Sequence, residues 1–193
     1  AVGDRQCDGR CVRQYARFRY GTYDGTTASV YVDGAFAGSV NVALNIFGWN
    51  YFDIGISSTG NKYDRTPCDI EIDELGVYNK KVLPAEQIAA CHQVFQSVYS
   101  SETPAVALPD PIAWYRFDDP ETVGKDSSGN GYDLTAVAGS GSSGTMKAPT
   151  VDVNSPIHGG MYNGRGGNGY LKWTGDVLPA KIPRGTDPST VTL

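Results

Sequence analysis

The stretch Asp69–Asn79, DIEIDELGVYN in one-letter code, decides between two descriptions of the fold. Isoleucine alternates with acidic residues here, which is typical of a strand because successive side chains of a strand point to opposite faces. In one unbroken strand, Glu71 and Asp73 share a face with Leu75, and Glu74 points to the other side. The stretch therefore either carries acid–base chemistry or is a structural strand.

The composition favours an all-β chain. Of the 193 residues, 40% are apolar and 19% are charged, and 24 glycines and 11 prolines suit many short strands joined by tight turns. The net charge is −5 and lysine and arginine form no cluster, which is unsuited to binding DNA or RNA because the phosphates must be neutralised. No apolar run approaches the roughly 20 residues that span a bilayer. We expect neither nucleic-acid binding nor a membrane span.

The clearest hairpin lies between residues 28 and 38. The runs 28–32 (ASVYV) and 35–38 (AFAG) flank Asp33 and Gly34, and an Asp-Gly pair predicts a type I′ turn, in which both central residues have positive φ. A further strand is predicted over 52–56 (FDIGI), with its apolar side chains alternating inward, followed by a polar loop.

One helix is predicted near residues 84–95. Pro84 suits the first position of a helix, and Glu86 in the first turn complements the helix dipole. Ile88, Cys91 and Phe95 form an apolar stripe at helical spacing. The helix is expected to pack on a sheet.

The four cysteines are Cys7, Cys11, Cys68 and Cys91. An even number in a chain rich in Gly, Ser, Thr and Tyr suits an oxidising compartment, so secretion is the leading inference. All four are disulfide candidates, forming either two bonds or one bond and two thiols, and a Cys68–Cys91 bond would tie the acidic stretch to the helix. A zinc site from Cys7-x3-Cys11 and Cys91-His92 is the less favoured alternative, because structural zinc sites usually pair two short knuckles.

Residues 99–111 (YSSETPAVALPDP) have the composition of a semi-rigid linker, with three prolines and no hydrophobic period. Beyond it, a dense turn is predicted at 125–131 (KDSSGNG), and strands are predicted over 112–117, 132–136 and 189–193. The glycine-rich run 158–170 lacks the strand–loop–helix setting of a phosphate cradle, so we expect hairpin turns there.

The motifs together resemble the laminin-G-like, concanavalin-A-like jelly-roll modules, which are close in style to the pentraxins. One set matches the C-terminal end of such a module: YDGTTASVYVDG (23–34), FDIG (52–55), IDELGVYN (72–79) and LPAEQI (83–88). A second set looks like its N-terminal start: AWYRFD (113–118), KDSSGNGYDL (125–134), GGMYNG (159–164) and YL (170–171). The resemblance implies an antiparallel jelly-roll β-sandwich.

The order of the two sets is inverted with respect to that family. The arrangement we expect is the C-terminal part of one module at 1–98, the linker 99–111, and the N-terminal part of a second module at 112–193. The alternative is one circularly permuted module over 1–193. Neither half alone should close a sandwich, because open sheets leave edges and one face unburied. Strands from the same chain or a neighbour are then required.

The resemblance also bears on enzyme activity. Jelly-roll glucanases carry Glu-x-Asp-x-Glu on one strand, because retaining hydrolysis needs two opposed carboxyl groups. Here Glu71 and Asp73 are followed by Leu75, so the position of the proton donor is apolar. His92 and His158 lack the neighbours of a Ser-His-Asp set. We predict that the chain is not an enzyme.

Calcium is the cofactor to consider, since members of that family often hold it on oxygen-rich loops. Asp118, Asp119, Asp126 and Asn130 lie around turns within 13 residues. The alternative, which we favour, is that these side chains cap turns through Asx hydrogen bonds.

Aromatic residues in loops are candidates for glycan binding. Trp49, Tyr51 and Tyr63 are the predicted glycan-binding residues, whereas Trp114 and Trp173 in strands are expected in the core. We expect an extracellular or cell-surface structural or adhesion module that contacts other protein modules, neighbouring copies or glycans within a larger or filamentous assembly. The alternative is a calcium-assisted, lectin-like module of a secreted glycan-active protein.

Overall fold

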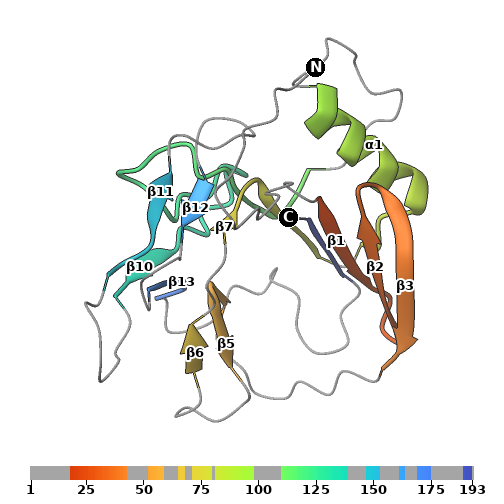
Figure 1. Ribbon diagram of the computed structural model, residues 1–193, viewed down its shortest axis with the longest axis horizontal. Helices are drawn as coiled ribbons and strands as arrows, with labels where there is room; N and C mark the ends of the chain where they lie inside the picture. Colours follow the sequence, from red (N-terminus) through yellow and green to blue (C-terminus); the bar gives the residue numbers. More distant parts are fainter. Residues whose placement is uncertain are drawn as a thin grey trace, which may run out of the picture.

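The computed structural model describes residues 18–42, 52–58, 65–67, 71–79, 81–97, 110–138, 147–152, 161–163, 169–174 and 189–192. These residues form antiparallel sheets and one short helix (Figure 1), which confirms the all-β class. No helix within them is long and apolar enough to cross a membrane.

The largest sheet has six strands in the order β3-β2-β1-β14-β8-β9. Their bounds are β1 Arg19–Tyr23, β2 Thr27–Val32, β3 Ala35–Asn41, β8 Leu75–Asn79, β9 Ala113–Tyr115 and β14 Ser189–Thr192. All neighbours pair antiparallel. The position of β14 is notable because it comes from the end of the sequence, yet it lies between β1 and β8.

Three smaller sheets complete the described strands. They comprise β10 Thr135–Val137, β13 Tyr170–Lys172 and β4 Asp53–Ile54; β11 Thr150–Asp152, β12 Met161–Asn163 and β7 Glu71–Ile72; and the pair β5 Ile56–Ser58 and β6 Arg65–Pro67. In two of these sheets a strand that precedes residues 99–111 pairs with one that follows, β4 with β13 and β7 with β12. The two predicted halves therefore share sheets.

The β2–β3 hairpin has the predicted turn. Asp33 has φ 52° and Gly34 has φ 78°, as a type I′ turn requires. The Asp33 carboxylate accepts a hydrogen bond from the Phe18 backbone N–H at 3.2 Å. A Cβ on Gly34 would lie 3.0 Å from the His92 Cβ, so the turn sits closely against the helix.

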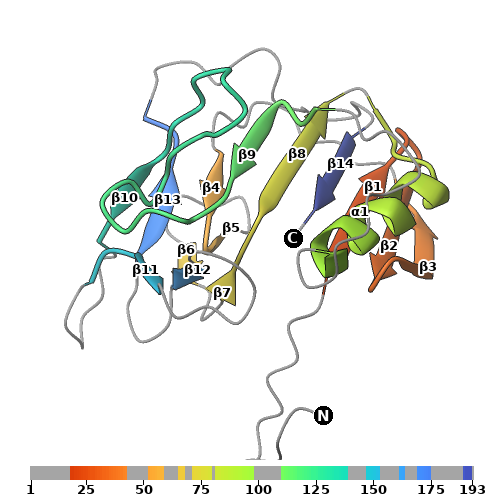
Figure 2. The ribbon, with the colours of Figure 1, turned by 90° about the horizontal axis from the view of Figure 1, so that it is seen from above.

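Helix α1 spans Ala85–Ser97, which confirms the predicted helix. The Pro84 carbonyl accepts hydrogen bonds from the N–H groups of Gln87 and Ile88 at 3.0 Å, so Pro84 closes the first turn from outside the helix. Figure 2 shows α1 lying across β1 and β2. Its buried side chains pack with aromatic residues of that sheet in a cluster of Tyr20, Tyr78, Leu83, Ile88 and Cys91.

The main core lies on the other face of β8 and β9. Leu75, Val77 and Tyr115 pack there with Ile54 of β4 and Leu171 of β13. Since Gly76 and Tyr78 are also buried, β8 is covered on both faces. This explains why its sequence, LGVYN, lacks the alternation of apolar and polar residues that a half-exposed strand has.

Two predicted strands are broken in the structure. The stretch 69–79 was expected to be continuous, but β7 and β8 belong to different sheets, and Glu74 between them has φ 51°. The stretch 52–56 is divided between β4 and β5 by Gly55, with φ 88°. In both places a residue in the left-handed region redirects the backbone from one sheet to another. The predicted polar loop 57–66 also contains parts of β5 and β6.

Candidate functional site

The break between β7 and β8 brings two adjacent carboxyl groups inside the protein. Asp73 is 7% exposed and Glu74 is 8% exposed, although acidic residues are almost never this buried without partners. The sequence predicted that Glu74 points to the face opposite Glu71 and Asp73, on the assumption of one regular strand. The positive φ of Glu74 ends the alternation of that strand, so this assumption does not hold. We call Asp73, Glu74, Trp114, Arg116 and Asp118 the acidic-turn cluster.

Glu74 is held by side chains of β9 and of the residues that follow it. Its Oε2 accepts a hydrogen bond from the Trp114 indole N–H at 2.6 Å, and its Oε1 lies 3.4 Å from the donor Arg116 Nε. The Arg116 guanidinium also lies 5.2 Å from the centre of the Trp114 ring. These contacts tie the start of β8 to β9.

The cluster reaches the surface through Arg116. Its Nη2 is 3.0 Å from Asp118 Oδ2, and the two side chains are 42% and 34% exposed. Phe117, between them, has φ 57°, so the chain turns sharply as it leaves β9. The surface part of the cluster is thus an exposed ion pair, which typically contributes at most about 1 kcal/mol.

Asp73 has fewer partners than Glu74. Its Oδ1 accepts a hydrogen bond from the Glu74 N–H at 2.8 Å, while its Oδ2 is buried and has no hydrogen-bond partner among the described residues. Burial, together with the negative charge of Glu74, raises the pKa of Asp73 to about 7. Protonation of Asp73 near neutral pH therefore removes the free-energy cost of burying its charge.

Burial also raises the pKa of Glu74, against the opposing effects of the Trp114 indole and the Arg116 guanidinium. A general acid must come within hydrogen-bond reach of its substrate. Asp73 and Glu74 are both buried residues, and the cluster can bind a proton and fasten β8 to β9.

The predicted acidic row is not formed. Glu71 lies in β7, which pairs with β12, whereas Leu75 lies in β8, in the six-stranded sheet. The row depended on one regular strand, and the chain instead changes sheets at Asp73 and Glu74. The sequence gives no clear signal for this change, because a positive φ at glutamate is uncommon.

Asp126, one of the calcium candidates, is buried and surrounded by donors of its own loop and of β9. Its Oδ1 accepts hydrogen bonds from the N–H groups of Trp114 at 3.0 Å and Ser128 at 2.9 Å. Its Oδ2 accepts from the Tyr132 N–H at 3.0 Å and the Ser128 hydroxyl at 2.9 Å. Burial acts to raise the pKa of Asp126, but these donors together hold it below its ordinary value.

The other calcium candidates have separate partners. Asp118 pairs with Arg116, Asp119 accepts from the Glu121 N–H at 2.9 Å and the Thr122 hydroxyl at 2.7 Å, and the Asn130 amide donates to the Ile112 carbonyl at 3.0 Å. The Asp119 contacts are of the Asx type that the favoured alternative expects, whereas Asp118 forms an ion pair and Asn130 binds a carbonyl 18 residues away. Within the described segments, no three His, Cys, Asp or Glu residues come together in a group that could hold a metal ion.

The structure places the predicted aromatic and cysteine sites as follows. Trp49, Tyr51, Tyr63, Cys7, Cys11 and Cys68 lie outside the described residues. Trp173 packs against the main core, as expected. Trp114 is only partly buried and belongs to neither core cluster of the described residues, and its indole donates to Glu74.

The Cys91 thiol is free and buried in the structure, which the predicted arrangement of one disulfide and two thiols allows. Cys91 lies on the inner side of α1, where it packs against Tyr20 and Tyr78, and the pairing of the cysteines stays a prediction. Burial raises the pKa of the Cys91 thiol to about 11, so the reactive thiolate is scarce at neutral pH.

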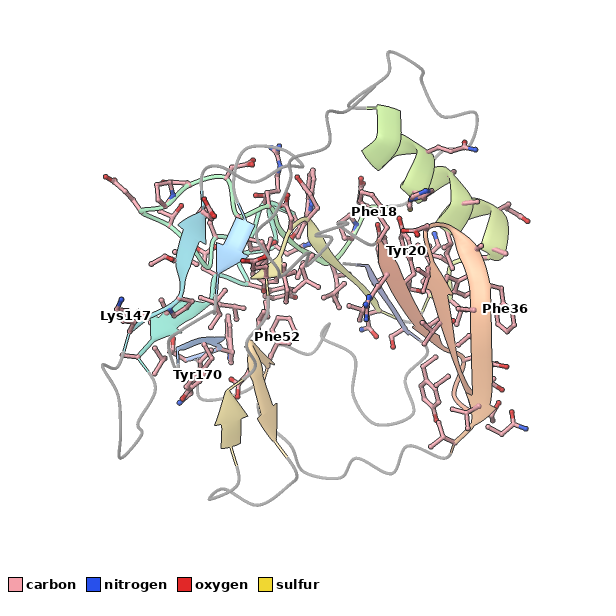
Figure 3. All side chains as sticks on the ribbon, viewed as in Figure 1. Phe18, Tyr20, Phe36, Phe52, Lys147 and Tyr170 are labelled. Atoms are coloured by element: carbon pink, nitrogen blue, oxygen red, sulfur yellow. The ribbon has the colours of Figure 1, made fainter. Side chains whose placement is uncertain are left out.

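Sequence reasoning missed an exposed apolar surface on the β2–β3 hairpin. Val30 is 48% exposed, and Phe36 and Val40 are each 61% exposed. Figure 3 shows Phe36 at the outer strand β3. The signal available in the sequence was the run Ala35–Asn41, which contains neither a charged residue nor a proline. Phe36 pairs with Tyr31, and their rings are in contact, so Phe36 lies on the opposite face of the hairpin from Val30 and Val40. We call Val30 and Val40, which share one face, the hairpin surface.

Comparison with known proteins gave no match to a family model, to a curated protein or to a solved structure.

Proposed function

We propose that this chain is a non-enzymatic, extracellular β-sandwich module that works in adhesion or assembly by contacting other protein modules. The observation that carries the proposal is the contrast between its acidic residues and its apolar ones. Asp73, Glu74 and Asp126 are buried within the fold, whereas Val30, Phe36 and Val40 are open to solvent. Exposed apolar side chains that gather on a surface, as Val30 and Val40 do on one face of the hairpin, mark contact sites.

The mixed strand pairing supports a single circularly permuted jelly-roll module over 1–193. Strand β14 joins β1 to β8, and β9 continues the same sheet beyond β8. In the tandem arrangement, strands on either side of 99–111 would belong to different modules. Their shared sheets favour one module that presents the hairpin surface at one end.

The test is an attachment assay on surfaces coated with the folded chain. Cells that deposit an extracellular matrix should attach to the coat above the level seen with albumin, and soluble chain should compete. The variant Val30→Ser should reduce attachment because it makes the hairpin surface more polar, whereas Val82→Ser, at a valine 37% exposed outside the hairpin, should not.

Turnover assays on a panel of polysaccharides complete the test. The proposal expects no release of reducing ends above a blank, because the buried carboxyl groups cannot protonate a leaving group. Attachment equal to that on albumin, or turnover that Glu74→Gln abolishes, would contradict the proposal.

A further inference from the structure

Strand β3 forms one edge of the six-stranded sheet, with β2 as its neighbour within the described segments. An edge strand offers backbone N–H and C=O groups to another strand, and proteins usually protect such edges with charges, prolines or bulges. The seven residues of β3, AFAGSVN, include no charge and no proline. The side chains of β3 therefore do not prevent another strand from pairing with this edge.

One protective feature is present and limits where pairing can occur. The β2–β3 register shifts between Val30 and Tyr31, because Val30 pairs with Gly38 and Tyr31 with Phe36. Ala37 is thus the extra residue of a bulge, which bends the strand locally. The regular part of the edge runs from Gly38 to Asn41.

The two faces of β3 differ on this regular part. Ser39 pairs with Ser29, and Val40 pairs with Ala28. Gly38 and Val40 therefore share one face, and Ser39 lies on the other. A Cβ built on Gly38 would meet no atom within 4 Å, so there is open space directly beside the exposed Val40 side chain.

We propose that β3 pairs antiparallel with β3 of a second copy of this chain, around a twofold axis at Ser39. This arrangement sets Val40 of each copy opposite Gly38 of the other, so that each valine fills the space beside a glycine. A second copy is favoured because a twofold axis brings like residues together, which a charged strand would resist. The chain carries a net charge of −5, and β3 is a neutral segment where two copies can approach.

The inference rests on the proposed function in taking the hairpin as the contact surface, and it names the partner. With the axis at Ser39, only Gly38, Ser39 and Val40 of each copy pair regularly, because Asn41 would face the bulge residue Ala37. This short edge buries little area, so the dimer is weak and depends on concentration. The six-stranded sheets of the two copies would be joined by hydrogen bonds between the two β3 strands and would form one continuous sheet across the axis.

Sedimentation velocity at low ionic strength, over a range of concentrations, tests the pairing. The wild type should show a reversible monomer–dimer equilibrium. Val40→Lys and Val40→Glu should each weaken dimerisation by about tenfold or more, because the axis places the two introduced charges on diagonal cross-strand positions. An equimolar mixture of the two variants should recover a heterodimer, and Val82→Lys should behave as wild type.

A second variant keeps the test independent of stability. Ser39→Cys places one cysteine of each copy next to the axis, within disulfide reach, so oxidation should give a covalent dimer that the wild type does not form. Equal circular dichroism melting curves would show that all variants fold.

A wild type that stays monomeric at all concentrations, or a Lys/Glu mixture that dimerises no better than either variant alone, would overturn the inference. If Val40→Lys loses cell attachment while the wild type is monomeric, the hairpin binds another protein, and the proposed function stands without this partner. If dimerisation is found without attachment, the inference stands and the proposed adhesive function fails.

Discussion

Asp73 and Glu74 are adjacent and equally buried, yet they have different numbers of hydrogen-bond donors. Glu74 accepts from the Trp114 indole and the Arg116 guanidinium. Asp73 accepts from the Glu74 N–H on Oδ1, and within the described part of the chain its Oδ2 has no donor. A buried carboxylate with too few donors is costly when charged and far less so when protonated. Asp73 is therefore the residue through which pH is expected to act most directly on stability.

Asp73→Asn tests this expectation. The pKa of Asp73 is about 7 in the folded chain, above its ordinary value of 3.8. Between pH 3.8 and about pH 7, the Asp73 carboxyl group is therefore protonated in the folded state and ionised in the unfolded state. Stability should therefore fall as pH rises from about 4 to 7, and Asn should remove much of that fall. Relative to wild type, Asp73→Asn should gain about 1 to 2 kcal/mol between pH 5 and pH 8, after allowance for solvent screening.

Urea unfolding followed by tryptophan fluorescence at the two pH values gives the required free energies. Glu74 keeps a smaller slope of the same sign in the variant, because burial raises its pKa as well. Parallel pH profiles for wild type and Asp73→Asn would contradict the assignment.

At the scale of elements, the 124–134 turn and β9 are held together by one carboxylate. Asp126 accepts from the Trp114 N–H of β9 and from the Tyr132 N–H beyond the turn. The Leu134 N–H donates to the Gly124 carbonyl at 2.8 Å, which closes the base of the turn. These hydrogen bonds hold the shape of the turn.

Asp126→Ala should lower the free energy of unfolding by about 3 kcal/mol, because it leaves several backbone N–H groups without an acceptor. Asp119→Ala is the matched control: it removes an exposed turn cap and should cost less than about 1 kcal/mol. Thermal unfolding with and without calcium gives both results. A rise in Tm on adding calcium that Asp126→Ala abolishes would instead support a calcium site.

The elements that could be predicted were those with local signals. Asp33 and Gly34 fixed the turn type, and Pro84 with the apolar stripe after it indicated the helix, because turn and cap chemistry depends on neighbouring residues. The breaks at Glu74 and Gly55 could not be predicted in the same way. Apolar residues alternate without interruption through Gly55, whereas the adjacent acids Asp73 and Glu74 shift the phase of the alternation without indicating a change of sheet. Only tertiary packing requires the chain to change sheets at these points.

At the scale of the whole molecule, the sheets join segments that are far apart in the sequence. Thr190 of β14 is buried, and its hydroxyl accepts from the Leu83 N–H at 2.9 Å and donates to the Lys81 carbonyl at 3.0 Å. Residues before and after 99–111 thus share backbone pairing, side-chain hydrogen bonds and one main core. The sequence signalled each strand from its own residues but not which strands would be neighbours.

The acidic-turn cluster and the hairpin surface could not be predicted from the sequence for the same reason: both depend on which strands are neighbours. Glu74 and Trp114 are 40 residues apart, and their contact follows from the pairing of β8 with β9. The exposure of Val40 follows from the place of β3 at the sheet edge. Periodicity describes one strand at a time, so neither feature could be located before the order of strands was known.

The central claim is that strands on both sides of residues 99–111 form one module, and limited proteolysis tests it most directly. A single cut within 99–111, followed by size-exclusion chromatography under native conditions and mass spectrometry, should yield two fragments that co-elute at the mass of one chain and separate in urea. Fragments that separate without denaturant would contradict the shared sheets and, with them, this account of the fold.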